Sequence, residues 1–249
     1  MMSLTACGAD TSEPAATPAS VVDDQSSSQD GATLTKANFT QQLTAAQQQV
    51  GSAHVEATLD FSGQQGTVSG DFAGFGGLGD LMMDTTVDVA GQHLSLLVVD
   101  STVYLRGAGL SSDPSKPWVR VDLDDPKNPL SSLLDSADPA NFSAYLEGVQ
   151  DLESRGAETV DGVQTQHYTA TIDTDTMLKA NSMFGGQDAA SLHMPAQITT
   201  DVWVDDKNLP VEVAVSLGDA GSLEAHFSQY GEPVSVQAPP AGQVTEFSL

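Results

Sequence analysis

The sequence predicts an α+β domain in which two or three helices cover a large, curved antiparallel β-sheet, a half-barrel. Three observations predict this fold. Runs in which apolar and polar residues alternate recur along most of the chain, as in strands with one buried face. Turn residues separate these runs at the spacing of hairpins. Only a few segments show the longer spacing of a helix.

The first predicted element is a helix over residues 35 to 50, where apolar residues recur at helical spacing: Phe39, Leu43, Ala46 and Val50. The spacing then changes to two, and six strands are predicted at residues 54 to 61, 66 to 73, 85 to 89, 94 to 98, 103 to 105 and 119 to 123. The glycine-rich stretch 74 to 79 lacks the Lys-Ser/Thr pair of a phosphate-binding loop, so we expect a plain loop there.

The second half is predicted to open with a helix led by Asp138-Pro139, with Phe142, Leu146 and Val149 on its apolar face. Strands at residues 152 to 160 and 164 to 172 follow, joined by Asp161-Gly162, a dipeptide that favours tight hairpin turns. A short helix at residues 174 to 184 precedes three further strands at 198 to 204, 209 to 217 and 223 to 227. The total is about ten strands.

The composition restricts the function. The 249 residues include 8 Lys and Arg against 34 Asp and Glu, and the formal net charge is -26. A field of this sign repels phosphate backbones, so we expect no nucleic-acid partner. The single cysteine excludes an internal disulfide and CxxC zinc or redox motifs. The apolar runs are too short for a membrane-spanning helix, which leaves the cysteine as the expected attachment point.

That cysteine ends the run Leu4-Thr5-Ala6-Cys7, which with Gly8 resembles a bacterial lipobox. In such precursors the thiol carries diacylglycerol and the chain is cut before the cysteine, so Cys7 is the expected lipidation site. Residues 1 to 7 are interpreted as the remnant of a signal peptide and lipobox. They are too short for a full secretory signal, so either translation starts upstream or a leader has been trimmed.

Residues 8 to 34 contain no aromatic residue and no Lys or Arg. Such a segment buries too little apolar surface to offset its ordering entropy, and it is predicted to be a disordered linker. The remainder, residues 35 to 249, is predicted to be a single domain, and we expect a monomer.

A series of short motifs resembles one family. In chain order these are Asp138-Pro139, Val160-Asp161-Gly162-Val163, His167-Tyr168, Asp173, Trp203-Val204-Asp205 and Leu209-Pro210. Their order resembles that in the actinobacterial lipoproteins of the LppX, LprA, LprF and LprG type. The resemblance implies a fold like that of the lipoprotein carriers LolA and LolB. It also implies a cavity between sheet and helices that holds the acyl chains of lipids or glycolipids.

The candidate lining of such a cavity follows from the alternation, which places ten apolar residues on one face of the sheet: Val55, Leu59, Phe61, Leu94, Leu96, Val98, Val202, Val204, Val211 and Val213. They can equally form a filled core. The first alternative predicts a lipid carrier anchored through Cys7 to the extracytoplasmic face of the plasma membrane. The second predicts a non-catalytic envelope lipoprotein that acts by protein contacts, with its acidic surface facing a basic partner.

Catalytic and metal sites are not predicted. The five histidines lack HxH or HxxxH spacing, and the acidic pairs lack the loop glycine and terminal Glu of an EF-hand. The chain has no GxSxG nucleophile elbow, so a hydrolase would need a Ser, a His and an acid from distant segments. We therefore expect no enzyme activity, no cofactor and no metal.

Overall fold

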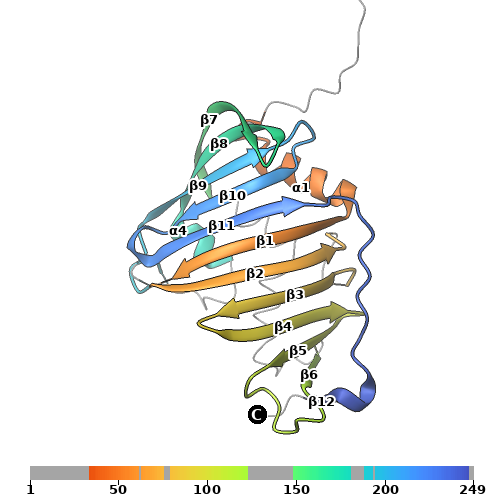
Figure 1. The fold of residues 1–249 in the computed structure, drawn as a ribbon. Coiled ribbons are helices and arrows are strands. Elements are labelled where there is room, and N and C mark those ends of the chain that lie inside the picture. The colour runs from red at the N-terminus through yellow and green to blue at the C-terminus, as the bar shows by residue number, and fades with distance from the viewer. Residues whose placement is uncertain are drawn as a thin grey trace, which may run out of the picture. The chain divides into compact units, whose positions relative to one another are not determined.

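The computed structural model describes residues 34 to 61, 63 to 75, 79 to 122, 148 to 180, 188 to 192 and 194 to 246. Within these ranges twelve strands form one sheet, in the order β12-β6-β5-β4-β3-β2-β1-β11-β10-β9-β8-β7 (Figure 1). Neighbouring strands are antiparallel except β12, which runs parallel to β6. The structure confirms the predicted large antiparallel sheet with few helices, and the described part is mostly β.

The first half of the described chain is one helix and a six-stranded meander. The elements are α1 (Phe39–Val50), β1 (Ser52–Phe61), β2 (Gln64–Ala73), β3 (Met82–Val89), β4 (Gln92–Val99), β5 (Thr102–Gly107) and β6 (Trp118–Asp122). Helix α1 ends because Gly51 adopts a left-handed conformation, with φ 76°, and its N–H bonds to the carbonyl of Gln47. The predicted helix and the six predicted strands are confirmed, with shifted ends.

The second half contains β7 (Val149–Val160), β8 (Val163–Asp173), α4 (Thr174–Ala180), β9 (Gln197–Val204), β10 (Pro210–Ser216), β11 (Gly221–Ser228) and β12 (Val244–Glu246). The helix predicted after Asp138-Pro139 falls outside the described residues. Its last predicted residue, Val149, is instead the first residue of β7, where it pairs with Ile172 of β8. The three-residue strand β12 was not predicted, because it is too short to show any alternation.

Two long-range connections complete the sheet. Strand β1 pairs with β11 over eight residues, which joins the first half of the chain to the second. After β11 the chain passes along the ends of the strands to β12, beside β6 (Figure 1). Val234, Val236 and Val244 of this C-terminal arm pack with a cluster that includes the buried Trp118 of β6. The arm therefore anchors the C-terminal end to the β6 edge.

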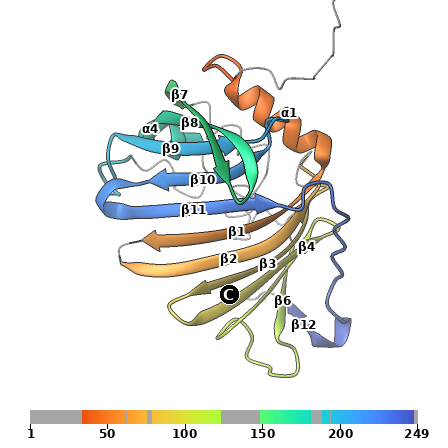
Figure 2. The same ribbon diagram turned by 45° about the horizontal axis from the view of Figure 1, so that its top comes forward.

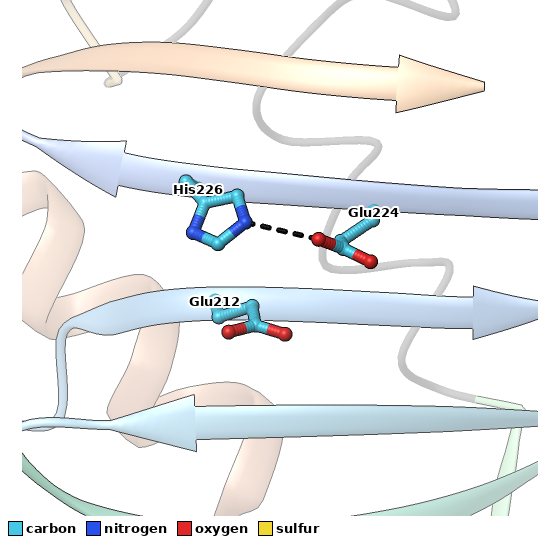
Figure 3. Close-up of side chains that lie close together, drawn as sticks. All are labelled: Glu212, Glu224 and His226. Carbon is cyan, nitrogen blue, oxygen red and sulfur yellow. Dashed lines mark hydrogen bonds and ion pairs between the residues drawn. The ribbon is translucent and has the colours of Figure 1, made fainter. Parts of the chain in front are cut away.

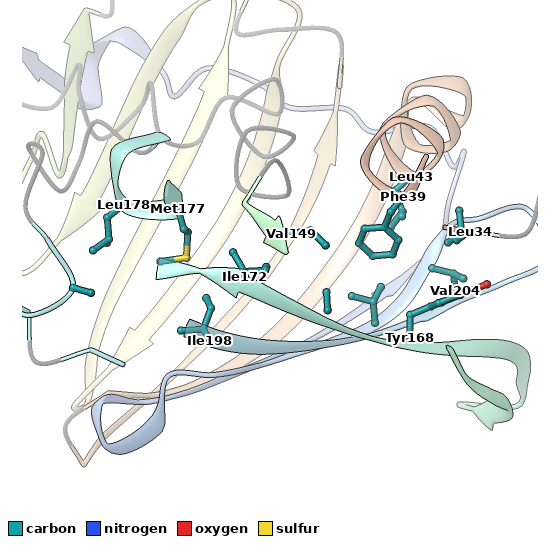
Figure 4. Close-up of a cluster of buried hydrophobic side chains, with 13 residues drawn as sticks. Leu34, Phe39, Leu43, Val149, Tyr168, Ile172, Met177, Leu178, Ile198 and Val204 are labelled. Atoms are coloured by element: carbon teal, nitrogen blue, oxygen red, sulfur yellow. The ribbon is translucent and has the colours of Figure 1, made fainter. Parts of the chain in front are cut away.

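The strand register separates the residues into two faces. We call the face that carries Val55 and Val213 the inner face and the opposite one the outer face. Helices α1 and α4 lie on the inner face of β8 and β9, where their apolar side chains meet those of the strands (Figure 4). A second inner cluster contains Leu81, Met83, Val98, Val103 and Val121. Leu34, assigned by the sequence to the linker, is 4% exposed and packs in the first cluster.

None of the helices in the described ranges has the length and apolar character needed to cross a membrane.

Helix α4 provides a prediction about pH. Asp173 Oδ1 accepts hydrogen bonds from the Thr176 hydroxyl, at 2.7 Å, and from the Thr176 N–H, at 2.8 Å. These bonds stabilise the carboxylate and lower the pKa of Asp173. A carboxyl group whose pKa is lower in the folded than in the unfolded state stabilises the fold at pH values above its unfolded-state pKa, about 4. This stabilisation is lost as the pH falls through the folded-state pKa. We expect Asp173→Asn to unfold at a lower temperature than wild type at pH 7 and to approach it at pH 3.

Thermal unfolding of both proteins across this pH range measures the effect. Thr176→Ala removes one of the two donors to the same carboxylate, so it should lose part of the same pH dependence. A difference between Asp173→Asn and wild type that stays constant from pH 7 to pH 3 would contradict the assignment.

Candidate functional site

An apolar cavity lies between the two helices and the inner face of β8, β9 and β10. Its volume is about 80 Å³, and it is lined by Phe39, Leu43, Ile172, Met177, Ile198, Thr200, Val202, Pro210, Val213 and Val215. Thr200 contributes the one hydroxyl of this lining. Because apolar cavities of this kind exclude water and accept hydrocarbon, the site suits an alkyl chain better than a polar ligand.

Helix α1 forms one wall of the cavity. Phe39 and Leu43 lie one turn apart on the same face of the helix and are 1% and 2% exposed. The Phe39 ring packs against Tyr168 of β8, with ring centroids 6.3 Å apart and an interplanar angle of 57°. Met177 of α4 supplies a flexible thioether on another side (Figure 4). The helices therefore present their apolar faces to the strands with a space left between them.

The register places nine of the ten predicted lining residues on the inner face, and they come from β1, β4, β9 and β10. Val202 and Val213 border the cavity itself, whereas Val204 belongs to the surrounding core. Leu96 and Val98 belong to the second inner cluster. The structure therefore brings only part of the predicted set together.

The tenth residue, Val211, lies at a β-bulge. Pro210 pairs with Val204 and Glu212 pairs with Trp203, so Val211 is the extra residue of β10. It is buried but does not border the cavity. Instead Pro210, its neighbour, takes the inward position expected of Val211.

Between the two inner clusters the face stays apolar but is only partly covered. We call this region the central strip and define it by six residues of β1 to β4: Leu59, Phe61, Val68, Val87, Val89 and Leu94. Phe61 is 55% exposed, and the other five are half-buried. Three of the predicted lining residues, Leu59, Phe61 and Leu94, belong to this strip.

Several cavity residues were missed by the sequence prediction. Phe39 and Leu43 were recognised as the apolar face of a helix, but the strands they would meet were not known. Ile172 and Ile198 carry the same alternation as the predicted residues. Pro210 gives no apolar-face signal, because its inward position depends on the bulge.

The outer face of β9 to β11 and of β1 to β3 is mostly polar and acidic. Glu212 of β10 and Glu224 and His226 of β11 lie close together, with potential ligand atoms within 4.8 Å of one another (Figure 3). His226 Nε2 lies 3.1 Å from Glu224 Oε1, and its Nδ1 lies 3.0 Å from Asp161 Oδ2. Carboxylates only accept hydrogen bonds, so this geometry favours the imidazolium. The bond to Glu224 is the main cause of the raised pKa of His226, whereas burial raises the pKa of Glu212.

The other outer-face histidines are also bound to carboxylates. His54 contacts Asp71, and His167 lies between Glu158 and Asp201 while it stacks on Trp203, with centroids 4.2 Å apart. Among the described histidines none has a serine as hydrogen-bond partner, and His193 falls outside the described residues. The described ranges thus contain no Ser-His-acid arrangement of the kind a hydrolase needs.

Acidic residues from the pairs that lack the EF-hand pattern have structural roles where they are described. Asp205 Oδ1 accepts the backbone N–H groups of Lys207 and Leu209 in the β9–β10 turn, both at 2.8 Å. Asp173 begins α4, as described above. These carboxylates stabilise a turn and a helix start through hydrogen bonds from nearby groups of the chain. Cys7 lies outside the described residues.

Two solved structures share the fold. The lipoprotein LppX of Mycobacterium tuberculosis is 19% identical and superposes with a TM-score of 0.56, covering 81% of this chain and 98% of that one. LprF of Mycobacterium bovis is 18% identical, with a TM-score of 0.57 and coverage of 82% and 96%. At this identity the likeness establishes the fold alone.

Two relatives are similar in sequence. The lipoarabinomannan carrier protein LprG of Mycobacteroides abscessus is 28% identical over 159 residues, which are 62% of this chain and 62% of that protein. A putative lipoprotein of Streptomyces coelicolor is 31% identical over 112 residues, 44% of this chain and 32% of that protein. The matches thus span less than two thirds of either relative.

The model of the LppX_LprAFG lipoprotein family matches residues 35 to 236. This range includes both described α-helices and every described strand except β12. Members of this family are non-catalytic lipoproteins of the cell envelope, held there by a lipid anchor. The predicted resemblance is therefore confirmed, and the chain belongs to the LppX_LprAFG lipoprotein family.

Proposed function

We propose that this lipoprotein holds the acyl chains of a lipid or glycolipid against the inner face of its sheet and carries that lipid within the cell envelope. It works at the extracytoplasmic face of the plasma membrane, attached through acylated Cys7. Residues 8 to 34 link the anchor to a single lipid-binding domain over residues 35 to 249, and the protein acts as a monomer.

The observation that supports this proposal most directly is the apolar cavity beside α1. A group the size of a water molecule or a methylene occupies about 30 Å³. The cavity of about 80 Å³ therefore holds two or three methylenes. Each buried methylene contributes about 0.8 kcal/mol. A longer chain extends beyond the cavity, and the central strip offers it further apolar surface.

The sequence relatives support the ligand class. LprG of Mycobacteroides abscessus is a carrier of lipoarabinomannan, a glycolipid, and it matches 159 residues of this chain. We therefore propose a glycolipid or a related acylated lipid as the ligand. The acidic outer face agrees with binding of the lipid at the inner face, because the acidic side chains repel anionic headgroups.

The test is native mass spectrometry of residues 31 to 249, the compact unit, after production in an actinobacterial host. Organic extraction and lipid analysis of the same sample follow. A stoichiometric adduct that is released as an acylated lipid supports the carrier function. A bare polypeptide mass that stays unchanged after incubation with host lipids would contradict it and favour the alternative of a filled core that acts by protein contacts.

A pair of variants on β10 locates the binding site. Val213 borders the cavity, while its neighbour Ala214 lies on the outer face, where it pairs with Glu224. We expect Val213→Phe to fill the cavity and to remove the burial of two or three methylenes. That is a loss of about 2 kcal/mol, or roughly 30-fold in affinity.

Ala214→Phe is the matched control, because the same side chain is added one residue away on the opposite face. Its affinity for extracted host lipid should stay within about twofold of wild type. Circular dichroism establishes that both variants are folded. Equal affinity of Val213→Phe and wild type for that lipid would place the acyl chain elsewhere.

A further inference from the structure

One buried hydroxyl interrupts the apolar inner face. Thr85 lies in the middle of β3 and is 3% exposed, and its Oγ1 has no hydrogen-bond partner. Within the described ranges it is the one buried side-chain oxygen or nitrogen without a partner. Buried polar groups are nearly always hydrogen-bonded, because an unmade bond costs free energy. A valine would have the same shape without that cost.

The neighbours of Thr85 explain why the hydroxyl has no protein partner. On the inner face Thr85 is paired with Gly70 of β2 and with Leu96 of β4. Gly70 offers no side chain, and a Cβ built at that residue would come within 2.6 Å of Thr85 Oγ1. The next inward residues of β3 are Met83 and Val87, which are apolar. The glycine therefore leaves space for the hydroxyl, while the side chains that flank it are apolar.

Thr85 lies at a boundary within the inner face. Met83 on one side belongs to the second inner cluster and is 5% exposed, whereas Val87 on the other side is a half-buried residue of the central strip. Leu96, directly across on β4, is itself only partly buried. A chain that lies on the strip therefore ends beside Thr85, where the neighbouring side chains of Val87 and Leu96 are only partly buried.

We propose that Thr85 Oγ1 donates a hydrogen bond to an ester carbonyl of the bound lipid. This inference rests on the proposed function and adds to it a residue that positions the ligand: the hydroxyl that binds the ester of the acyl chain. An ester has acceptors and no donor, so the threonine hydroxyl is the donor. A hydrogen bond in such apolar surroundings is stronger than in water, so it fixes the ester at one position along the face.

The experiment compares two probes and two variants of the 31 to 249 unit. The probes are dipalmitoylglycerol and its diether analogue, which has ether linkages in place of the ester linkages and therefore lacks the carbonyls. Both are presented in detergent micelles. Thr85→Val removes the hydroxyl without changing the shape of the side chain. Thr86→Val is the matched control, because Thr86 is the next residue of β3, on the exposed outer face.

We expect Thr85→Val to weaken binding of the diester roughly tenfold and binding of the diether less than twofold. Thr86→Val should change neither. The unfolding temperature of the Thr85→Val unit without lipid should equal or exceed that of wild type, because an unpaired buried hydroxyl is removed. This second measurement separates a ligand-binding hydroxyl from a structural one.

Three results would overturn the inference. If wild type binds both probes and Thr85→Val binds the diester equally well, the carbonyl does not contact Thr85, and the proposed function stands. If Thr85→Val unfolds several degrees below wild type, the hydroxyl has a structural partner. If wild type binds neither the probes nor host lipid, the proposed function fails and the inference fails with it.

Discussion

Replacement of Phe39 by alanine should lower the free energy of unfolding by about 3 to 5 kcal/mol, the range for aromatic residues deleted from a core. The Phe39 side chain is 1% exposed, and it contacts Tyr168 of β8 from the first turn of α1. Its loss would also enlarge the cavity that it borders, and lining atoms without partners lose their dispersion contacts. The helix would then be held to the sheet mainly through Leu43.

Urea unfolding followed by tryptophan fluorescence measures the change, with the slope of the transition compared between variants. Gln41→Ala is the control, since Gln41 is exposed on the same turn of α1 and its loss should cost less than about 0.5 kcal/mol. A loss below about 1 kcal/mol for Phe39→Ala would mean that α1 contributes little to the stability of the fold.

Replacement of Gly221 by alanine should destabilise the sheet by roughly 3 kcal/mol or more. Gly221 begins β11 with φ 142°, and a Cβ there would lie 1.9 Å from the carbonyl oxygen of Asp60 in β1. Neither backbone can move away easily, because Gly221 pairs with Phe61 and its carbonyl accepts the N–H of Leu217 at 2.9 Å. The clash falls on the pairing that joins the two halves of the chain.

Gly91→Ala separates the steric clash from the cost of the backbone conformation. Gly91 also has a positive φ, 77°, but nothing lies within 4 Å of the Cβ position. Its replacement should cost only about 1 kcal/mol. Thermal unfolding of the two variants compares their losses of stability. Similar losses for both would show that the β1–β11 contact adapts to a methyl group.

The alternation of residue types predicted which face of each strand is apolar, because that pattern depends on the strand alone. It was right for Val55, Leu59 and Val213, which share the inner face although they come from distant parts of the chain. The register assigns no face to Val211, because Val211 is the unpaired residue of a bulge. Proline in a strand is compatible with a bulge and equally with the first residue of a strand, so Pro210 alone does not predict the bulge.

The arrangements that depend on two elements at once were not predictable. The cavity exists because Phe39 and Met177, on two helices, stop short of the strands at Val213. Its volume is set by how far each helix lies from the sheet. The neighbourhood of Glu212 and His226 likewise requires the register of β10 against β11. Such contacts follow from tertiary packing and leave no periodic signal in either segment.

The pairing of β1 with β11 also sets when the protein can fold. Residues 54 to 61 form ladder hydrogen bonds with residues 221 to 228, so the centre of the sheet stays incomplete until nearly the whole chain is available. Closure of so long a loop is slow compared with hairpin formation. A chain that emerges with its N-terminus first therefore cannot complete the centre of its sheet, and with it a continuous apolar inner face, until residue 228 has emerged.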